Sequence, residues 1–264
     1  MTDPGAPLVL ISPAMGIGSR YYRPLVEAFE ARGWAARALP RRGFEPGEPA
    51  ASRQHDWSYG DEIDDTARAV AAARAEAPGR PVIVLGHSLG GQLAVGHQLN
   101  RAPADGIVTV GTCLPYHRDY PYRGLPLALM GGVIVPALTA LFGHLPKPAF
   151  GGPGARTLMR EWGRMAVTGR TPFPAAAPVE TPALVVALQG DRLAPPAAVD
   201  RFAGRLFAAG SLTRWLYRRE DVPEGASNDH IYWVRSPGPV VDKILSWWAA
   251  SADQTSSVKT ADGS

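Results

Sequence analysis

The sequence predicts an α/β fold, with a mainly parallel sheet of about six strands and helices on both faces. Short apolar runs alternate along the chain with segments that have helical spacing. These runs are nearly continuous in apolar residues, which is typical of strands that helices cover on both faces. The chain has 264 residues, 45% of them hydrophobic, which is enough for one large domain with a substantial core.

The predicted elements follow one another in a regular order. Strands are expected at residues 8–11, 34–39, 81–85, 106–110, 183–188 and 213–217. Helices are expected at residues 22–32, 62–77, 89–100, 157–167, 197–207 and 240–249. We therefore divide the chain into a first core part (residues 1–112), a cap insertion (113–174), a second core part (175–250) and a polar, mobile tail (251–264).

The cap insertion interrupts the alternation after the fourth predicted strand. It is expected to lie over one edge of the sheet, to roof the cleft and to set specificity. Residues 124–143 carry no charge over 20 positions, but Pro126, Gly131 and Pro136 interrupt the run. We expect a helix that is buried or lines the pocket, with membrane contact through residues 124–143 as the alternative.

Charge and composition disfavour several classes of partner. The net charge is only +3 and the 27 basic residues are scattered, so no nucleic acid is expected as a partner. Cys113 is the single cysteine, and the amino-terminal residues lack the pattern of a signal peptide, so a cytoplasmic location is expected. No cluster has metal-ligand spacing, so we expect no metal and no organic cofactor. The oligomeric state stays open.

The stretch VIVLGHSLGG (residues 82–91) places a serine at the carboxyl end of the third predicted strand. Gly86, Ser88 and Gly90 match G-x-S-x-G, the nucleophile elbow, between a strand and a helix. A Cβ at either glycine would crowd the tight turn, which presents the Ser88 hydroxyl to the cleft. The alternative is a glycine-rich turn whose serine only caps the helix. The flanking strand and helix favour the nucleophile.

A serine nucleophile needs a base, and the base needs an acid that orients it. In elbow enzymes both follow the serine, the acid first and the histidine later. Asp191 comes directly after the strand predicted at residues 183–188, and Asp229 is the alternative acid. His230 is the expected base, because no other histidine of the six lies between the last predicted strand and the last predicted helix.

Two backbone amides are expected to hold the oxyanion of the intermediate. One is the N–H of Leu89, directly after the serine, and the other is the N–H of Met15, in the loop after the first strand. The cap is rich in Leu, Val, Pro and aromatic residues, which predicts a mainly apolar acyl substrate. The side chains expected to line its pocket are those of His87, Tyr116, His117 and Phe142.

From residue 8 to the last helix, the chain resembles the α/β-hydrolase superfamily of serine hydrolases. SPAMGIGSRYYRPL, WSYGDEIDD and GHSLGGQL are similar to a bacterial subgroup of predicted α/β-hydrolases. The resemblance implies Ser88 as nucleophile, Asp191 as acid and His230 as base, with Met15 and Leu89 as oxyanion donors. The chain departs from the superfamily at Pro13 and Ala14, where His-Gly is usual.

Three functions are compatible with these features. The first is hydrolysis of a carboxylic ester or thioester through an acyl-enzyme. The second keeps the same triad in an acyltransferase, a cyclase or a thioesterase of a biosynthetic pathway, where the acceptor can be an alcohol or an amine. The third is a ligand-binding protein without catalysis, because a fold does not determine a function.

Overall fold

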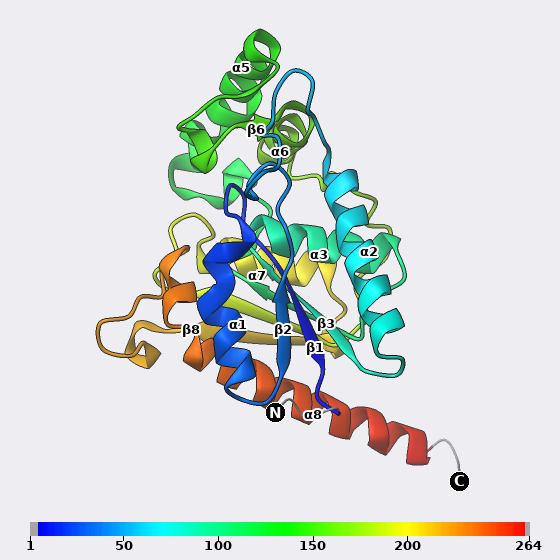
Figure 1. Ribbon diagram of the computed structural model, residues 1–264. Coiled ribbons are helices and arrows are strands. Elements are labelled where there is room, and N and C mark those ends of the chain that lie inside the picture. Colours follow the sequence, from blue (N-terminus) through cyan, green and yellow to red (C-terminus); the bar gives the residue numbers. More distant parts are fainter. Residues whose placement is uncertain (1–4, 262–264) are drawn as a thin grey trace.

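The computed structural model describes residues 5–261 and contains a six-stranded sheet in the order β2-β1-β3-β4-β7-β8 (Figure 1). All neighbouring strands are parallel, which confirms the predicted fold class. The strands are β1 (Leu8–Ser12), β2 (Ala35–Ala38), β3 (Val82–His87), β4 (Gly106–Val110), β7 (Ala183–Leu188) and β8 (Leu212–Tyr217).

Helices cover both faces of this sheet because its strands are apolar on both faces. In β1, Leu8 and Leu10 pack with the helices of one face, and Val9 and Ile11 pack with those of the other. The first face carries α2 (Tyr59–Glu76), α3 (Leu89–Asn100) and α7 (Pro196–Leu206). The second carries α1 (Arg23–Glu30) and α8 (Gly238–Ala261), and Figure 1 shows α1 and α2 on opposite sides of β1 and β2.

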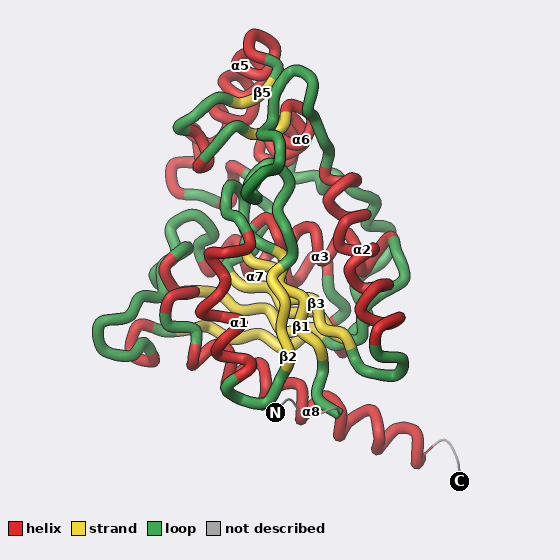
Figure 2. Tube along the Cα trace, in the orientation of Figure 1, coloured by secondary structure: helices red, strands yellow, loops and turns green. Residues whose placement is uncertain are grey.

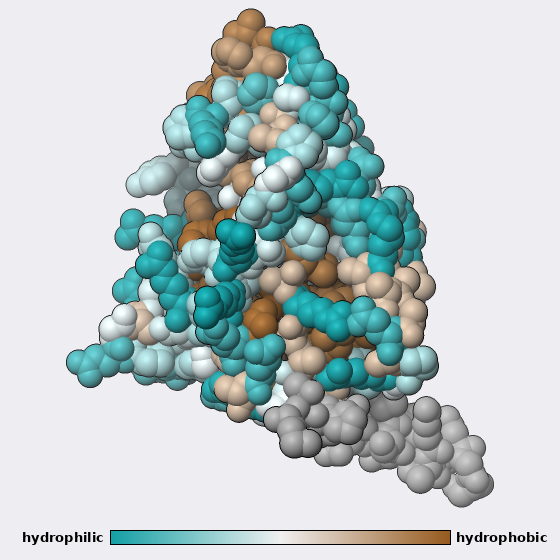
Figure 3. Space-filling view, in the orientation of Figure 1, coloured by the Kyte–Doolittle hydropathy of each residue, from teal (hydrophilic) through white to brown (hydrophobic). Residues whose placement is uncertain are grey.

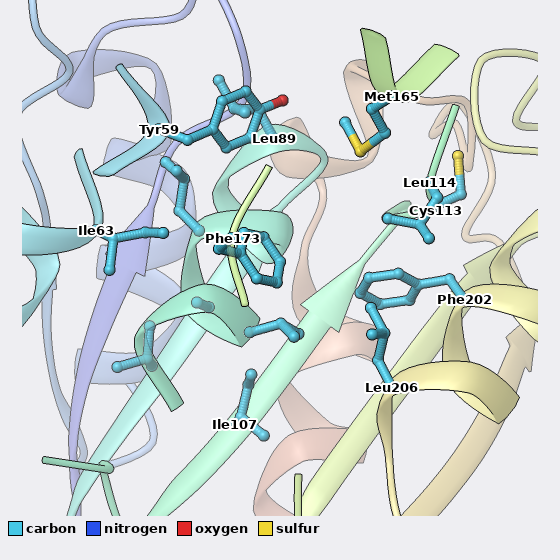
Figure 4. Packing of buried hydrophobic residues seen from close by; sticks show 14 of the residues in the cluster. Tyr59, Ile63, Leu89, Ile107, Cys113, Leu114, Met165, Phe173, Phe202 and Leu206 are labelled. Atoms are coloured by element: carbon cyan, nitrogen blue, oxygen red, sulfur yellow. The ribbon is translucent and has the colours of Figure 1, made fainter. Parts of the chain in front are cut away.

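Figure 4 shows the packing on the first face. Ile63 of α2 and Phe202 of α7 lie on either side of Ile107, which points up from β4. Tyr59 is fully buried in the same cluster, and its hydroxyl donates to the side-chain oxygen of Gln92 over 2.8 Å. The cluster continues upward to Met165, so the sheet and the segment above it share one core.

The chain changes direction across the sheet at β1. It passes from β1 to β2 on one side and then to β3 on the other, so the carboxyl ends of β1 and β3 are neighbours. Ser12 at the end of β1 is paired in register with Gly86 near the end of β3. In open α/β sheets, ligands bind outside the strand carboxyl ends at such a reversal.

Residues 113–174 leave the sheet after β4 and return to it at β7. They form α4 (Leu125–Leu129), a π-helical turn, η4 (Met130–Ile134), α5 (Val135–Phe142), a small antiparallel ribbon of β5 (His144–Leu145) and β6 (Gly154–Ala155), and α6 (Arg156–Thr168). Figures 1 and 2 show this segment beyond the upper ends of the strands and not along a side edge of the sheet. We call the continuous helix of α4, η4 and α5 (residues 125–142) the cap helix.

The cap helix is less buried than the sequence predicted. Leu125, Leu129 and Leu141 are 71%, 51% and 66% exposed. The helix packs on α6 through the face that includes the buried residues Gly131 and Val135, and its ends also contact η2 (His117–Asp119) and β5. The prediction of a buried helix is therefore wrong for its outer face, because a helix that packs through one face leaves the opposite face to solvent. The pocket-lining part of that prediction holds for Leu127 and Met130 on the inner side.

Two helix boundaries also differ from the predictions. The Ser58 hydroxyl caps the Asp61 N–H (3.2 Å) and Asp61 accepts from the Ser58 N–H (2.8 Å), so α2 begins at Tyr59. This reciprocal cap stabilises three further residues at the helix start. At the other end of the chain, α8 continues to Ala261, where a tail was expected, because residues 250–261 contain neither Pro nor Gly. Residues 262–264 of the predicted tail lie outside the described residues.

Short 3₁₀ helices fill several connections. They are η1 (Ser19–Tyr22), η2 (His117–Asp119), η3 (Pro121–Gly124), η5 (Ala149–Gly151), η6 (Ala209–Ser211), η7 (Arg219–Asp221) and η8 (Tyr232–Arg235). Of these, η1 and η8 flank the loops that carry the candidate site.

Candidate active site

The turn from β3 to α3 holds Ser88 in a strained backbone conformation. Its φ of 54° and ψ of −117° lie in a region that side-chain-bearing residues rarely adopt. The Ser88 N–H donates to the Val110 carbonyl over 3.0 Å, and the Thr112 hydroxyl donates to the Ser88 carbonyl over 3.2 Å. These bonds to the end of β4 hold the turn in place, so the strain is maintained by the surrounding structure.

Glycine is required on both sides of Ser88 because the chain has no free space there. A Cβ on Gly86 would lie 2.3 Å from the Cα of Gly91, and a Cβ on Gly90 would lie 2.0 Å from the Ser12 carbonyl oxygen. Both distances are far below van der Waals contact. The close approach of α3 to β1 and β3 therefore explains the glycines of the motif.

The structure brings Ser88, His230 and Asp191 together from three distant parts of the chain. The Ser88 Oγ lies 2.9 Å from His230 Nε2, and His230 Nδ1 lies 2.6 Å from Asp191 Oδ2. The other carboxylate oxygen of Asp191 accepts from the amides of Leu193 and Ala194, each over 2.8 Å. The aspartate is buried and oriented by three donors, as an acid that steers an imidazole requires.

Asp229, the alternative acid, has a different place. Its Oδ1 accepts from the amides of Ile231 and Tyr232 over 2.9 and 2.6 Å, which closes the turn after His230. The Asp229 carboxylate therefore stabilises the backbone of its own turn. Among the described hydrogen bonds, none joins this carboxylate to the His230 imidazole, which bonds Asp191. Of the two candidate acids, only Asp191 pairs with His230.

A glycine that the sequence reasoning missed lies beneath this pair. Gly111 follows β4 directly and has a φ of +56°. A Cβ there would lie 3.0 Å from Asp191 Oδ2 and 3.4 Å from His230 Nδ1. The sequence signal for Gly111 is its position directly after β4, the strand that pairs with the elbow strand β3.

A buried line of hydrogen bonds joins the loop after β1 to the loop that carries His230. The Ala14 N–H donates to the Tyr22 hydroxyl (2.7 Å), which bonds His87 Nδ1 (2.8 Å), and His87 Nε2 bonds the His230 carbonyl (2.7 Å). A carbonyl can only accept, so Nε2 carries the proton and Nδ1 accepts from Tyr22. Trp233 Nε1 lies farther from Nε2, at 3.3 Å.

His87 remains neutral in this line. Burial lowers the pKa of its imidazole well below the usual value, and the nearby His230 lowers it further. The bonds to Tyr22 and to the His230 carbonyl require a neutral ring, because one ring nitrogen accepts and the other donates. His87 is therefore a structural bridge, and the prediction that it lines the pocket is wrong, because its ring is fully buried beneath the site.

The cavity over Ser88 has a volume of about 660 Å³. The core contributes Ser88, His230 and the loops around them, and residues 113–174 contribute the opposite wall. The lining from the core is Ala14, Met15, Gly16, Ile17, Ser88, Leu89, Gln92, Gly111, Arg192, Leu193, Ala194, His230 and Ile231. The lining from residues 113–174 is Cys113, Pro115, Tyr120, Pro126, Leu127, Met130, Phe150, Gly151 and Trp162.

The other predicted pocket residues do not line this cavity. His117 Nδ1 bonds the Arg123 carbonyl over 2.8 Å, and Tyr116 packs edge-on against the His117 ring. Phe142 is 45% exposed at the far end of α5. The predictions for these three residues are wrong. Tyr116 and His117 precede the cap helix, where Tyr116 also packs against Gly169, and the cap helix itself presents Leu127 and Met130 to the cavity.

The two predicted oxyanion donors, Met15 and Leu89, border the cavity beside Ser88. Leu89 is the first residue of α3, so its N–H lies at a helix amino terminus, where partial positive charge gathers. Met15 follows Ala14, whose N–H is held by Tyr22. A second cavity, of about 590 Å³, borders Arg41 and Glu62 and includes none of Ser88, Asp191 and His230.

Arg41 and Glu62 form a buried ion pair behind the loop after β1. The Arg41 guanidinium also donates to the Pro13 carbonyl, and the Glu62 carboxylate accepts from Trp57 Nε1 over 2.9 Å. Burial lowers the pKa of Arg41 to about 10, so it stays charged at neutral pH. These groups fix Pro13, two residues before Met15. Among the described residues, no group of three or more His, Cys, Asp or Glu could hold a metal ion.

Residues 4–150, more than half of the chain, match the family model described as serine aminopeptidase, S33. The chain belongs to this family. It is therefore a hydrolase of the α/β-hydrolase superfamily, as the elbow and the order of the acid and the histidine indicated. A search of curated protein sequences found no match.

Solved structures share the fold at low sequence identity. A monoacylglycerol lipase from Paleococcus ferrophilus is 17% identical, with 92% of this chain and 96% of that chain covered and a TM-score of 0.59. A soluble variant of the monoglyceride lipase from Saccharomyces cerevisiae is 14% identical, with 93% and 87% covered and a TM-score of 0.64. A lipase-esterase related protein from Clostridium acetobutylicum is 11% identical, with 94% and 97% covered and a TM-score of 0.61.

Proposed function

We propose that this protein is a serine hydrolase that cleaves carboxylic esters with an apolar acyl group through an acyl-enzyme. The observation that carries the proposal is the hydrogen-bonded series from Ser88 through His230 to Asp191, which opens onto a mainly apolar cavity. Nucleophile, base and orienting acid are within hydrogen-bonding distance without any ligand in place.

The acylation step follows from these contacts. His230 Nε2 takes the hydroxyl proton of Ser88 as Oγ attacks the ester carbonyl, and Asp191 stabilises the imidazolium. The negative oxygen of the tetrahedral intermediate is placed at the amides of Met15 and Leu89. The intermediate then expels the alcohol, which takes the proton from His230 Nε2 and leaves the acyl group on Ser88 Oγ.

Deacylation repeats the sequence with water. His230 Nε2 takes a proton from a water molecule that attacks the acyl carbonyl, and the second intermediate expels Ser88 Oγ. The proton returns to Ser88, the carboxylic acid leaves, and the site regains its starting state. Thioesters react by the same steps, with a thiol as the leaving group.

The lining of the cavity favours an ester with an apolar acyl group over a peptide with a free amino terminus. An aminopeptidase needs an anionic group to hold the α-ammonium of its substrate. None of the described residues that line the cavity is Asp or Glu, and Arg192 adds positive charge. The names of two structural relatives, both lipases of monoacylglycerols, agree with an ester substrate.

The test is release of p-nitrophenol from acyl esters of increasing chain length, with the wild-type protein and with Ser88→Ala. Turnover by the wild type that is lost in the variant supports the proposal, and the optimum of chain length measures the cavity. An amino-acid p-nitroanilide is the comparison substrate. Hydrolysis of the anilide in preference to the esters would assign the site to peptides and contradict the proposal.

A further inference from the structure

The two faces of the cap helix differ in what they contact. Its inner face packs on α6 through Gly131, and a Cβ there would lie 2.8 Å from the Gly163 carbonyl oxygen. Its outer face carries Leu125, Leu129, Val133 and Leu141 in steps of four or eight residues, and each is more than half exposed. In Figure 3, hydrophobic residues gather at the tip of the molecule over α5. A soluble monomer rarely leaves such a stripe uncovered without a partner.

The charges of residues 113–174 are unbalanced. This segment has seven Arg and Lys against two Asp and Glu, a net charge of +5, whereas the remainder of the chain has 20 against 22. Arg123 directly precedes the cap helix, Lys147 follows it, and the Arg53 guanidinium donates to the Leu141 carbonyl at its carboxyl end over 2.8 Å. All three cations are exposed, and none forms an ion pair with the described side chains of residues 5–251.

We propose that the outer face of the cap helix docks on an anionic lipid surface. The apolar stripe enters the interface, and Arg53, Arg123 and Lys147 contact the lipid phosphates. An apolar helix bordered by cations has the two features that bind such a surface, and neither alone gives stable attachment. A second copy of the chain is a poorer occupant, because two faces of net positive charge would repel each other.

The structure favours docking over spanning. Within the described residues, one helical segment, Pro121–Phe142, has the length and composition to cross a bilayer, with a mean hydropathy of 2.1 and only 17% of its most apolar window buried. Its inner face nevertheless packs on α6 at Gly131, and crossing would separate these helices. The backbone at Tyr122 and Arg123, with φ of 54° and 57°, also leaves the helical region.

Docking would bring the cavity to the lipid. Leu127 and Met130, on the inner side of the same helix, line the cavity above Ser88. An apolar ester dissolved in the lipid would then be one helix away from the candidate nucleophile. Binding to the surface depends on the outer face and its bordering cations and not on Ser88, so the inference stands apart from the proposed function and can fail independently of it.

The first experiment measures cosedimentation with vesicles of phosphatidylcholine, with and without about 30 mol % phosphatidylglycerol. The triple variant Leu129→Gln, Val133→Gln, Leu141→Gln removes the stripe with residues that favour helices. We expect the wild type to bind the anionic vesicles and the variant to bind at least roughly 10-fold more weakly. Circular dichroism and the hydrolysis of p-nitrophenyl acetate, which is soluble, check that the variant folds.

The second experiment changes charge at two places. The triple variant Arg53→Gln, Arg123→Gln, Lys147→Gln neutralises the border of the cap helix. The triple variant Arg214→Gln, Arg218→Gln, Arg219→Gln makes the same change of net charge in β8 and directly after it, away from the cap. The first variant should lose roughly 100-fold in affinity for anionic vesicles. The second should bind like the wild type, because its cations do not reach the docked surface.

Three results would overturn the inference. The first is a wild type that does not bind the anionic vesicles. The second is equal loss of binding in both charge variants, which would show a general charge effect. The third is a wild-type dimer that the stripe variant converts to a monomer, because the outer face would then be an interface between copies of this chain.

Discussion

The elbow and the cap helix border the same cavity but are held in different ways. At the elbow, the backbone of α3 lies against the backbone of β1 and β3, so that a single added Cβ on Gly90 would meet the Ser12 carbonyl oxygen at 2.0 Å. The cap helix rests on α6 along one face, and its other face is exposed. The comparison teaches that this fold fixes the reacting groups tightly and leaves the opposite wall free to vary.

The largest expected effect is at the orienting acid. Asp191→Asn keeps the shape of the side chain but replaces the charge that selects the His230 tautomer, so kcat on p-nitrophenyl butyrate should fall about 10⁴-fold. Asp229→Asn is the matched control, because Asp229 bonds only backbone amides in its turn. A comparable loss of kcat in both variants would show that the acid has been assigned to the wrong residue.

The next effect should come from Gly111→Ala. The new methyl group would press on Asp191 and His230 from 3.0 and 3.4 Å, and small displacements of reacting groups cost about 10²-fold in rate. Gly33→Ala is the control, since Gly33 also has a positive φ but nothing within 4 Å of its would-be Cβ. Both variants should lose stability in thermal melts, and only Gly111→Ala should lose kcat. Equal kcat values in the two variants would show that the close packing at Gly111 does not constrain Asp191 and His230.

A smaller loss is expected from Tyr22→Phe, which removes the hydroxyl between Ala14 and His87. The Met15 amide would then be less well placed, and kcat should fall roughly 10-fold with little change in KM. Tyr217→Phe is the control, because the buried Tyr217 hydroxyl has no hydrogen-bond partner in the described chain. If KM alone changes, Tyr22 shapes the pocket and does not position the oxyanion loop.

The smallest effect on the chemistry is expected at the cap. Met130→Ala should leave kcat for p-nitrophenyl acetate within about threefold of the wild type and move the optimum toward longer acyl chains, because it removes side-chain volume from the far wall. The test compares the rates of the wild type and of Met130→Ala on p-nitrophenyl esters of increasing acyl chain length. A loss of acetate turnover as large as that of Gly111→Ala would contradict the division between a fixed site and a variable wall.

The same division explains what the sequence could predict. The apolar pattern predicts the six strands, and the chain order then predicts the elbow after β3, Asp191 after β7 and His230 in the segment between β8 and α8. The cavity lining could not be predicted in this way. Phe142 has the aromatic side chain expected in an apolar pocket, but the rotation of the cap helix, which contains a π-helical turn, presents Leu127 and Met130 to the cavity instead.

Tertiary contacts also determine the role of His87 and the exposure of the cap helix, which both differ from expectation. His87 lies within the motif, but only the contacts with Tyr22 and the His230 carbonyl show it to be a bridge beneath the site. The outer face of the cap helix has the composition of a buried segment, and only the packing of the opposite face on α6 shows that this outer face is exposed. Composition alone cannot distinguish a helix covered by protein from one that a lipid surface would cover.

The central claim is that Ser88 is the nucleophile, and the mass of the protein after reaction with a fluorophosphonate tests it most directly. We expect one phosphonyl adduct per chain, on the peptide that contains Ser88, and none in Ser88→Ala. We also expect slow labelling of Asp191→Asn, because the base is then less able to take the Ser88 proton. An adduct on another residue, or an unlabelled wild type that still hydrolyses esters, would show that Ser88 is not the nucleophile.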